Sequence, residues 1–331
     1  MAIILAIESS CDETAAAILK DKKELLANVV STQIATHKLY GGVVPELASR
    51  MHVENISYVI KEALAKAEVT MEQIDAIAVT RGPGLIGSLH VGMQAAKTLA
   101  YAFDKPLIGV HHIAGHIYAN QLVSELKFPL MALVVSGGHT ELVYMRDHLQ
   151  FEIIGTTLDD AIGEAYDKVG RVIHVPYPGG PEIDRLAKHG KPIYPLPRPL
   201  DDDTYNFSYS GLKSAVINLV HKMDQRHEEV NKEDLSCSFQ EAALGILVSK
   251  TLRAAKAYDV KQVIVAGGVS ANSKLRADLT TAFEKEPIEL ILPPLWCCTD
   301  NAAMIAMAGS YMYDQKCFAD LKLSARPSLV L

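Results

Sequence analysis

Long apolar runs and paired cysteines are missing from this chain of 331 residues. No apolar run approaches the ~20 residues that a membrane-spanning helix needs, so we expect no association with a membrane. The five cysteines contain no C-x-x-C pair, which favours reduced thiols in a cytoplasm over a disulfide framework. The chain also begins without the basic segment of a signal peptide, and its first residues are expected to form a buried strand.

Two nucleotide-binding signatures are missing as well. The chain has no G-x-x-x-x-G-K-[ST] pattern and no G-x-G-x-x-G after its first strand, which argues against P-loop and Rossmann proteins. Basic charge is scarce, because 32 Lys and Arg residues stand against 39 Asp and Glu residues and give a formal net charge of −7. Any contact with nucleic acid must therefore depend on a local basic patch.

What the chain does contain is a series of elements that occurs twice. Three short strands joined by tight turns are expected in each half, at 3–8, 14–19 and 24–32 and again at 130–136, 140–146 and 149–156. Further helices are expected at 45–67, 88–103, 111–124, 239–258, 273–284 and 299–315, and further strands at 74–80, 106–110, 262–266 and 288–292. The duplication predicts an α/β protein with two domains, 1–128 and 129–331, that face each other across a cleft.

The second half contains an irregular insertion at about 171–236. Seven of the 15 prolines fall within Pro176–Pro199, so the first part of the insertion is expected to lack regular structure. Between Lys168 and Arg198, six Lys and Arg residues minus two acidic residues give a local charge of +4. The insertion is either a solvated loop or a contact surface for a polyanion.

A pair of histidines opens the helix that is expected after the strand at 106–110. His112 and His116 are four residues apart and share one helical face, the spacing that lets two imidazoles bind one metal ion. Asp300 is the candidate third ligand, because it follows a strand and a Pro-Pro turn, where open α/β sheets bind ligands. Alternatively, Thr299 or Asp300 caps the last helix, and the histidines are ordinary core or surface residues.

Three turns have the composition of binding loops for phosphate or polyhydroxyl groups. The first, 9–14, is expected to expose hydroxyl and carboxylate groups at a hairpin tip. The second and third, 135–140 and 267–272, contain glycine pairs that let a ligand approach the backbone. Their placement at equivalent points of a duplicated unit favours binding over the alternative of ordinary polar turns.

Ten segments of this sequence occur in the same order in one known family: IESSCDET, GGVVPELASRMHVENI, RGPGLIGSLHVGMQAAKTLA, GVHHIAGH, VVSGGHTELV, DDAIGEAYDKVGR, PYPGGPEID, SFQEAALGILVSKT, VAGGVSANSKLR and CTDNAAMIA. The chain thus resembles the tRNA N6-adenosine threonylcarbamoyltransferase family, called TsaD in bacteria and formerly O-sialoglycoprotein endopeptidase. The resemblance runs from Ile3 to about Arg326. It implies an actin-like, sugar-kinase-like fold with two domains and a central cleft.

The resemblance also implies an activity. Family members transfer the threonylcarbamoyl group of threonylcarbamoyl-AMP to the N6 amine of the adenosine immediately 3′ of the anticodon, in tRNAs that read codons beginning with A. The alternatives are a small-molecule kinase or ATPase of the same superfamily, and the older interpretation of a metalloprotease. A kinase is not expected to need the histidine pair, and the pair lacks the glutamate base of H-E-x-x-H metalloproteases.

The family's site residues can be carried onto this sequence. Its metal ligands match His112, His116 and Asp300, which would hold one divalent ion, iron or zinc. Its substrate-binding positions match Val135, Ser136, Gly137, Gly138, His139, Asp167, Gly180, Asp184 and Asn272. Asp12 or Glu13 is the candidate acceptor for the proton of the attacking amine, because the first hairpin faces the cleft in this fold. Alternatively, both acids order the substrate or a partner.

The resemblance implies several partners for a cytoplasmic protein. These are tRNA, a TsaB-like protein of the same fold, a TsaE-like ATPase, and a TsaC-like synthase that makes the adenylate upstream. The helix expected at 45–67 is the candidate docking surface, against the alternative that it only covers its own sheet. The basic insertion, which includes Lys188 and Lys191, supplies only part of the charge that tRNA binding needs.

Overall fold

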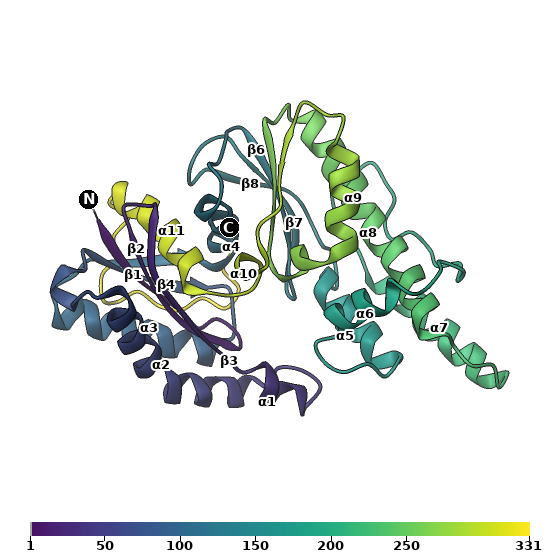
Figure 1. The fold of residues 1–331 in the computed structure, drawn as a ribbon, viewed down its shortest axis with the longest axis horizontal. Helices are drawn as coiled ribbons and strands as arrows, with labels where there is room; N and C mark the ends of the chain where they lie inside the picture. Colours follow the sequence, from purple (N-terminus) through teal and green to yellow (C-terminus); the bar gives the residue numbers. More distant parts are fainter. Residues whose placement is uncertain (1) are drawn as a thin grey trace. The chain divides into compact units, whose positions relative to one another are not determined.

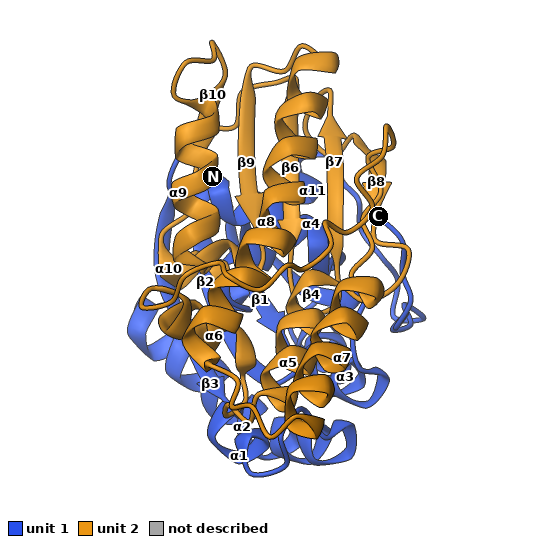
Figure 2. Cartoon of the chain, turned by 90° about the vertical axis from the view of Figure 1, so that its right-hand side faces the viewer, with its two compact units in different colours: residues 1–125, 299–331 blue, residues 126–298 orange. Residues whose placement is uncertain are grey.

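The computed structural model of the chain describes residues 2–331 (Figure 1). These residues form two compact units, which Figure 2 distinguishes by colour. Unit 1 contains the chain up to Glu125 together with Thr299–Leu331, and unit 2 contains Leu126–Cys298. We expected the second domain to continue to residue 331, but the last segment of the chain packs with the first part instead.

Unit 1 is built on a five-stranded sheet with the strand order β3-β2-β1-β4-β5. Its strands are β1 (Ile3–Glu8), β2 (Glu13–Lys20), β3 (Glu24–Thr32), β4 (Ala76–Gly82) and β5 (Leu107–His111). β1, β2 and β3 pair antiparallel, while β4 and β5 run parallel to β1. β1 and β2 are buried along almost their whole length, so helices must cover both faces of the sheet.

Helices cover both faces of this sheet in Figure 1, with α2 and α3 on one side and α4 and α11 on the other. The bounds in unit 1 are α1 (Ile34–Lys38), α2 (Pro45–Ala67), α3 (Ile86–Ala102), α4 (His112–Ala119) and α11 (Ala302–Asp314), with 3-10 turns η1 (Met71–Gln73) and η2 (Asn120–Leu122). α11 explains why the last segment belongs to unit 1, because its buried residues pack on β1, β2 and α4.

Unit 2 repeats this topology with the strand order β10-β9-β6-β7-β8. Its strands are β6 (Leu130–Val135), β7 (Thr140–Met145), β8 (Phe151–Thr156), β9 (Gln262–Ala266) and β10 (Glu289–Ile291). β6, β7 and β8 pair antiparallel, and β9 and β10 continue the sheet in parallel. The expected duplication is confirmed, and the β6–β7 turn occupies the place of the β1–β2 turn.

The helices of unit 2 build its core together with β6, β7 and β9. Their bounds are α5 (Ile162–Val172), α6 (Gly179–Ala187), α7 (Ser210–Gln225), α8 (Lys232–Ala257), α9 (Ser273–Phe283) and α10 (Leu295–Cys298), with the 3-10 turn η3 (Gly268–Ala271). Leu133 of the sheet, Tyr166 of α5 and Phe239 of α8 are among the buried side chains that join these elements. This core fixes the ends of α5, α6 and α9 relative to the sheet of unit 2.

The insertion at about 171–236 is more regular than its prolines predict. We expected no regular structure in its first part, but α6 begins directly after Pro178 and carries Pro181 in its first turn. Proline is tolerated there because the first amides of a helix have no partner within the helix. The prolines from 192 to 199 do lie outside helices and strands.

Two helix starts also differ from the expectation. α8 begins at Lys232 and not at residue 239, because the side chain of Asn231 caps the amides of Glu233 and Asp234. α11 begins at Ala302 and not at residue 299, because Asn301 is its cap and accepts from the Met304 amide. The first turn of α8 is polar, so its apolar periodicity begins only after the true start, whereas α11 is apolar from its first residue.

Candidate functional site

The histidine pair stands at the start of α4, directly after β5. His111, the last residue of β5, caps α4 by accepting from the Ile113 amide on Nδ1 at 3.2 Å, and its Nε2 donates to the Leu329 carbonyl. The helix therefore starts at His112 and places His116 one turn later on the same face. The two rings lie 4.7 Å apart, nearly perpendicular to each other.

Asp300 completes this cluster from the loop before α11. Its Oδ1 lies 3.0 Å from Nε2 of His116 and 3.6 Å from Nε2 of His112. The alternative that Thr299 or Asp300 caps the helix is wrong, since Asn301 does so. All three residues belong to unit 1, and a ligand atom of each lies within 4.8 Å of the others. Atoms bound to one ion at ~2.0–2.2 Å have separations of roughly 3–4 Å, so the spacing suits a metal.

His116 gives the clearest sign that the cluster fits a cation. Its side chain is buried, and neither ring nitrogen has a hydrogen-bond partner among residues 2–331. Nε2 is close to the Asp300 carboxylate, but the two groups are not aligned for a hydrogen bond. Because a buried nitrogen without a partner is costly, this geometry is typical of a ligand that a metal would satisfy.

Glu8, the last residue of β1, orients His112. Its carboxylate is fully buried and accepts from Thr80 Oγ1 at 2.6 Å and from the Ser10 amide. The other carboxylate contact is to Nδ1 of His112 at 3.1 Å. A carboxylate only accepts, so Nδ1 donates to Glu8 and Nε2, which lies toward Asp300, is left as the atom that can bind a metal. Sequence reasoning missed this role, although an acid at the end of an apolar strand is a signal that could have found it.

The charges of the cluster favour one added positive charge. Burial alone would lower the pKa of His112, but the negative charges of Asp300 and Glu8 outweigh it and raise the pKa to about 9. Burial alone would raise the pKa of Glu8, but its contacts with His112 and Thr80 lower it. Two carboxylates and two imidazoles therefore attract either a proton or a metal cation.

The β1–β2 turn is buried, which corrects the expectation of an exposed tip. Asp12 and Glu13 are each 8% exposed. Glu13 accepts from Thr32 Oγ1 at 3.1 Å. Burial, with the nearby charges of Asp300 and Asp12, raises the pKa of Glu13 well above its usual range. Glu13 thus lies in the electrostatic field of Asp300, a member of the histidine and aspartate cluster.

The equivalent turn of unit 2, between β6 and β7, is open. Gly137 and Gly138 are exposed, and no heavy atom lies within 4 Å of the place where a Cβ would be added to either. Within the turn, the Ser136 amide bonds to the His139 carbonyl at 2.8 Å and the His139 amide to Ser136 Oγ at 3.1 Å. Backbone and open space, rather than charged side chains, characterise this turn.

The other expected substrate-binding residues lie in α5, in α6 and at the N-terminus of α9. Asp167 of α5 accepts from the Gly179 amide at 2.7 Å, at the start of α6, beside Gly180. Asp184 of α6 accepts from the amide and hydroxyl of Ser273, the first residue of α9. Helix N-termini are favourable sites for phosphate, because their first amides point outward.

Asn272 is held by partners that sequence reasoning missed. Its Oδ1 caps α9 through the Leu275 amide, and its Nδ2 donates to Gln240 at 2.5 Å and to the Tyr166 hydroxyl at 3.3 Å. Gly267 precedes this turn with a φ of +91°, and a Cβ there would meet the Val135 carbonyl at 2.5 Å. The structure thus brings the expected binding residues of unit 2 close together. The contacts of Asn272 with Gln240 and Tyr166 could not be predicted, because no sequence pattern pairs these distant positions.

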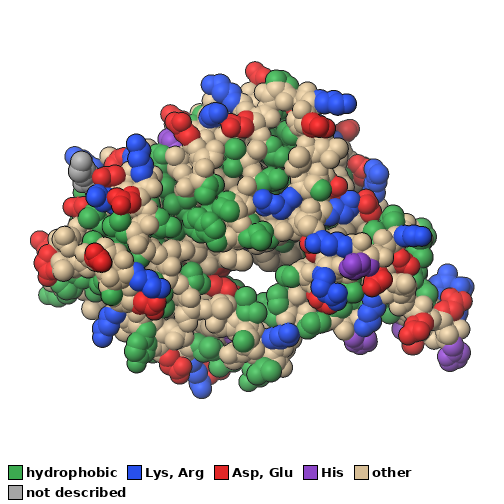
Figure 3. Space-filling model, viewed as in Figure 1, with side chains coloured by type: hydrophobic (Ala, Val, Ile, Leu, Met, Phe, Trp, Pro, Cys, Tyr) green, Lys and Arg blue, Asp and Glu red, His purple; other side chains and the backbone are tan. Residues whose placement is uncertain are grey.

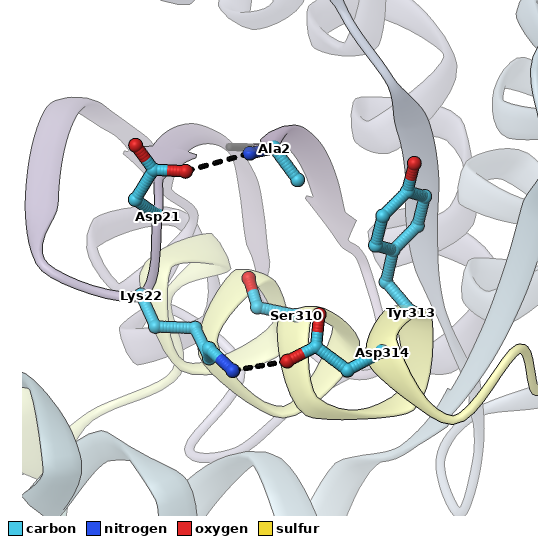
Figure 4. A pocket seen from close by; sticks show the side chains of 6 residues that line it. All are labelled: Ala2, Asp21, Lys22, Ser310, Tyr313 and Asp314. Carbon is cyan, nitrogen blue, oxygen red and sulfur yellow. Dashed lines mark hydrogen bonds and ion pairs between the residues drawn. The ribbon is translucent and has the colours of Figure 1, made fainter.

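A separate cavity of about 280 Å³ lies in unit 1 between the β2–β3 turn and the end of α11 (Figure 4). Its lining residues are Ala2, Asp21, Lys22, Ser310, Tyr313 and Asp314. Lys22 forms an ion pair with Asp314, and the Ala2 amide donates to Asp21 at 2.6 Å. The ion pair ties α11 to the β2–β3 turn, and the cavity is lined by none of the site residues expected from the sequence.

The basic insertion of unit 2 is exposed. Figure 3 shows Lys, Arg and His side chains gathered over the part of unit 2 that contains α6 and α7. Lys188 and Lys191 are both exposed, and Lys188 lies 3.9 Å from the Asp184 carboxylate. Acidic side chains stand among them, so the positive surface is local.

Known structures share the fold at low sequence identity. The crystal structure of HypF from T. kodakarensis matches 97% of this chain and 49% of its own length, with a TM-score of 0.66 and 13% identity. The activator of the 2-hydroxyisocaproyl-CoA dehydratase from Clostridium difficile matches 96% of this chain and 98% of its own length, with a TM-score of 0.53 and 14% identity. These are proteins of the actin-like ATPase fold, which is the fold class expected from the sequence.

No helix within residues 2–331 has the length and apolar character needed to cross a membrane.

Closer relatives define the family. The family model described as tRNA N6-adenosine threonylcarbamoyltransferase matches residues 24–307. A Bacillus cereus protein of that name is 62% identical over 329 residues, which cover 99% of this chain and 96% of the relative. The Anoxybacillus flavithermus protein is 58% identical over 330 residues, 99% of this chain and 97% of the relative. The chain therefore belongs to the tRNA N6-adenosine threonylcarbamoyltransferase family.

Proposed function

We propose that this chain transfers the threonylcarbamoyl group of threonylcarbamoyl-AMP to the N6 amine of the adenosine 3′ of the anticodon in tRNA. The main support is its 62% identity, over nearly its full length, to a relative that bears the name of this activity. The cluster of His112, His116 and Asp300 adds a metal-binding arrangement that the alternatives do not need. We also propose that the reaction takes place in the cytoplasm.

Unit 2 binds the adenylate in this proposal. The phosphate lies at the open β6–β7 turn, where Gly137 and Gly138 leave room for it. The adenosine lies near Asp184 and Asn272, at the start of α9. Both side chains already hold hydrogen bonds to the first turn of α9, so they contribute chiefly by fixing the position of this helix end beside the adenosine.

Unit 1 supplies the groups for the transfer. The amine nitrogen of adenosine forms a bond to the carbonyl carbon of the threonylcarbamoyl group, the bond from that carbon to the phosphate oxygen breaks, and AMP leaves with the electron pair. Asp12 or Glu13 accepts the proton that the amine loses. Since the mixed anhydride is already activated, positioning and charge stabilisation supply most of the remaining rate enhancement.

One divalent metal ion, iron or zinc, is proposed for the unit 1 cluster. His112 and His116 would hold it through their Nε2 atoms and Asp300 through a carboxylate oxygen, while Glu8 keeps His112 in the ligating tautomer. When bound, such an ion supplies Lewis-acid polarisation of a substrate oxygen.

Partners are part of the proposal. An acidic chain of net charge −7 should bind tRNA weakly alone. We propose that α2 receives a TsaB-like protein, since Val53 and Tyr58 on this helix are 63% and 73% exposed. A TsaE-like ATPase and a TsaC-like synthase, which makes the adenylate, complete the system. The isolated chain is therefore expected to be nearly inactive.

The test is nucleoside analysis of unmodified tRNA after incubation with threonine, bicarbonate, ATP and the partner proteins. We expect threonylcarbamoyladenosine only when this chain is added. The Bacillus cereus relative serves as the positive control. If the relative gives product and this chain does not, with the same partners and tRNA, the proposed function is wrong.

A further inference from the structure

The β1–β2 turn is held at three successive carbonyl groups. The Ser10 carbonyl accepts from the Leu85 amide at 2.8 Å, and the Asp12 carbonyl accepts from the Gln33 amide at 3.0 Å. Between them, the Cys11 carbonyl accepts from Nε2 of His52 at 2.9 Å. Two of these donors are backbone amides, so the bond from His52 is the one that a side chain controls.

His52 holds both ends of the acidic pair. It lies on α2 and is fully buried. Because a carbonyl oxygen only accepts, Nε2 carries the proton, and Nδ1 accepts from Thr14 Oγ1 at 2.7 Å. Burial lowers the pKa of His52, which favours this neutral form. One imidazole thus bonds to Cys11 and to Thr14, the residues on either side of Asp12 and Glu13.

We propose that His52 is a positioning residue, which joins α2 to both ends of the Asp12–Glu13 pair and fixes the direction of these two carboxylates during the transfer. The inference rests on the proposed function, because in that function one of these carboxylates accepts the proton of the attacking amine. A displacement of ~1 Å at a reacting group can cost about 100-fold in rate, so a single buried tether is enough to matter. The bonds of His52 to Thr14 and Cys11 involve no member of the metal cluster.

Three variants separate positioning from simple destabilisation. His52→Leu removes both hydrogen bonds and leaves an apolar side chain in the buried site. His52→Gln keeps an N–H donor near the position of Nε2 and can restore the bond to Cys11. Ile56→Ala is the matched control, because Ile56 is buried on the same helix one turn later and its loss weakens packing without removing a bond to the turn.

The first readout does not depend on activity. Cys11 lies in the turn and is partly buried, so its alkylation by iodoacetamide, followed by peptide mass, reports on opening of the turn. We expect His52→Leu to raise the labelling rate about tenfold over the parent and over Ile56→Ala, because the bond to the Cys11 carbonyl is lost together with the bond to Thr14. His52→Gln should label at an intermediate rate. If His52→Leu does not fold, Thr14→Val removes the second bond and is compared with the same control.

The second readout is the split between kcat and KM in the reconstituted transfer reaction. We expect His52→Leu to lower kcat by about 10–100-fold with KM nearly unchanged, and His52→Gln to recover part of the loss. Equal labelling of Cys11 in His52→Leu and the parent would overturn the inference, as would a kcat no lower than that of Ile56→Ala. If the parent itself makes no product, the proposed function fails, while Cys11 labelling still decides whether His52 holds the turn.

Discussion

The two hairpin turns occupy equivalent places in their sheets but are built in opposite ways. In unit 1, the β1–β2 turn carries Asp12 and Glu13, is buried, and is pinned by hydrogen bonds from three other segments. In unit 2, the β6–β7 turn carries Gly137 and Gly138, is exposed, and leaves open space beside both glycines. The same topology therefore presents side-chain chemistry in one unit and accessible backbone in the other.

The contrast extends to buried carboxylates. Glu8 of unit 1 has three polar partners, and these contacts lower its pKa despite complete burial. Glu141 of unit 2 has an Oε2 atom without a hydrogen-bond partner among residues 2–331, and burial raises its pKa. The pKa values of the two buried carboxylates thus shift in opposite directions, because only Glu8 has hydrogen-bond donors and a nearby positive charge that stabilise its ionised form.

The largest expected effect is on the metal cluster of unit 1. His116→Ala should lower the initial rate of threonylcarbamoyladenosine formation by about 1000-fold, because a cation that stabilises transition-state charge contributes several kcal/mol. His90→Ala is the matched control, since His90 is an exposed histidine of α3 in the same unit. Equal rates in the two variants would remove the cluster from the mechanism.

A smaller effect is expected when Glu8, the residue that orients the metal-ligand candidate His112, is changed. Glu8→Gln should weaken metal affinity by about 10–100-fold, because the amide cannot hold His112 as the carboxylate does. Glu141→Gln provides the comparison, a buried carboxylate of unit 2 that lies outside the cluster. Competition with a metal-binding dye measures the affinity, and an unchanged value for Glu8→Gln would mean that Glu8 does not support the site.

The open turn of unit 2 is tested by filling it. Gly138→Val should weaken binding of a stable adenylate analogue about tenfold, equivalent to ~1.4 kcal/mol, with the melting temperature nearly unchanged because a Cβ added here meets no heavy atom within 4 Å. In Gly163→Ala the new Cβ would meet the Ser136 carbonyl at 2.6 Å, so this variant should lose about 1–3 kcal/mol of stability. Calorimetry measures both quantities, and full affinity in Gly138→Val would place the nucleotide elsewhere.

The basic insertion should have a moderate, salt-dependent effect. Replacing Lys188 and Lys191 together by Gln should weaken tRNA binding and reduce the slope of log affinity against log salt by about 2. Lys261 and Lys285, also exposed in unit 2 but outside the insertion, are the control pair. An identical slope in both double variants would show that the insertion does not contact phosphate.

The smallest effect concerns Glu141 and pH. An acid whose pKa is raised on folding binds its proton more tightly in the native state, so it costs stability as pH rises above its unfolded value of ~4.3. Glu141→Gln should therefore match the parent near pH 4 and exceed its stability by about 1 kcal/mol at pH 7. Urea unfolding at the two pH values measures the difference, and a gain confined to low pH would contradict the sign.

Patterns within one element were sufficient for much of the fold. The bounds 3–8, 24–32, 45–67 and 262–266 were predicted from apolar periodicity and punctuating residues, and the structure has the same bounds. The pair His112 and His116 also follows from helical spacing alone. In contrast, Thr299, Asp300 and Asn301 can each cap a helix, and only the folded chain distinguishes the cap Asn301 from the ligand candidate Asp300.

Features that depend on distant contacts were not predicted. Glu8 and His112 are 104 positions apart, and His52 meets Thr14 across 38 positions, so no local pattern pairs them. The prolines predict no helix at α6, yet Pro178 and Pro181 fit its cap and first turn, where proline removes no bond within the helix. The sequence also does not show that the acidic β1–β2 turn is buried while the glycine-containing β6–β7 turn is open, because this difference depends on the segments packed around each turn.

Elemental analysis of two variants tests most directly the central claim, that the metal is held by the cluster of unit 1 and not by the open turn of unit 2. Purified parent and Gly138→Val should each contain about one equivalent of iron or zinc per chain, because the change lies outside the cluster. His116→Ala should contain almost none, because the remaining two ligands hold the ion too weakly to survive purification. Equal metal content in the two variants would contradict the account.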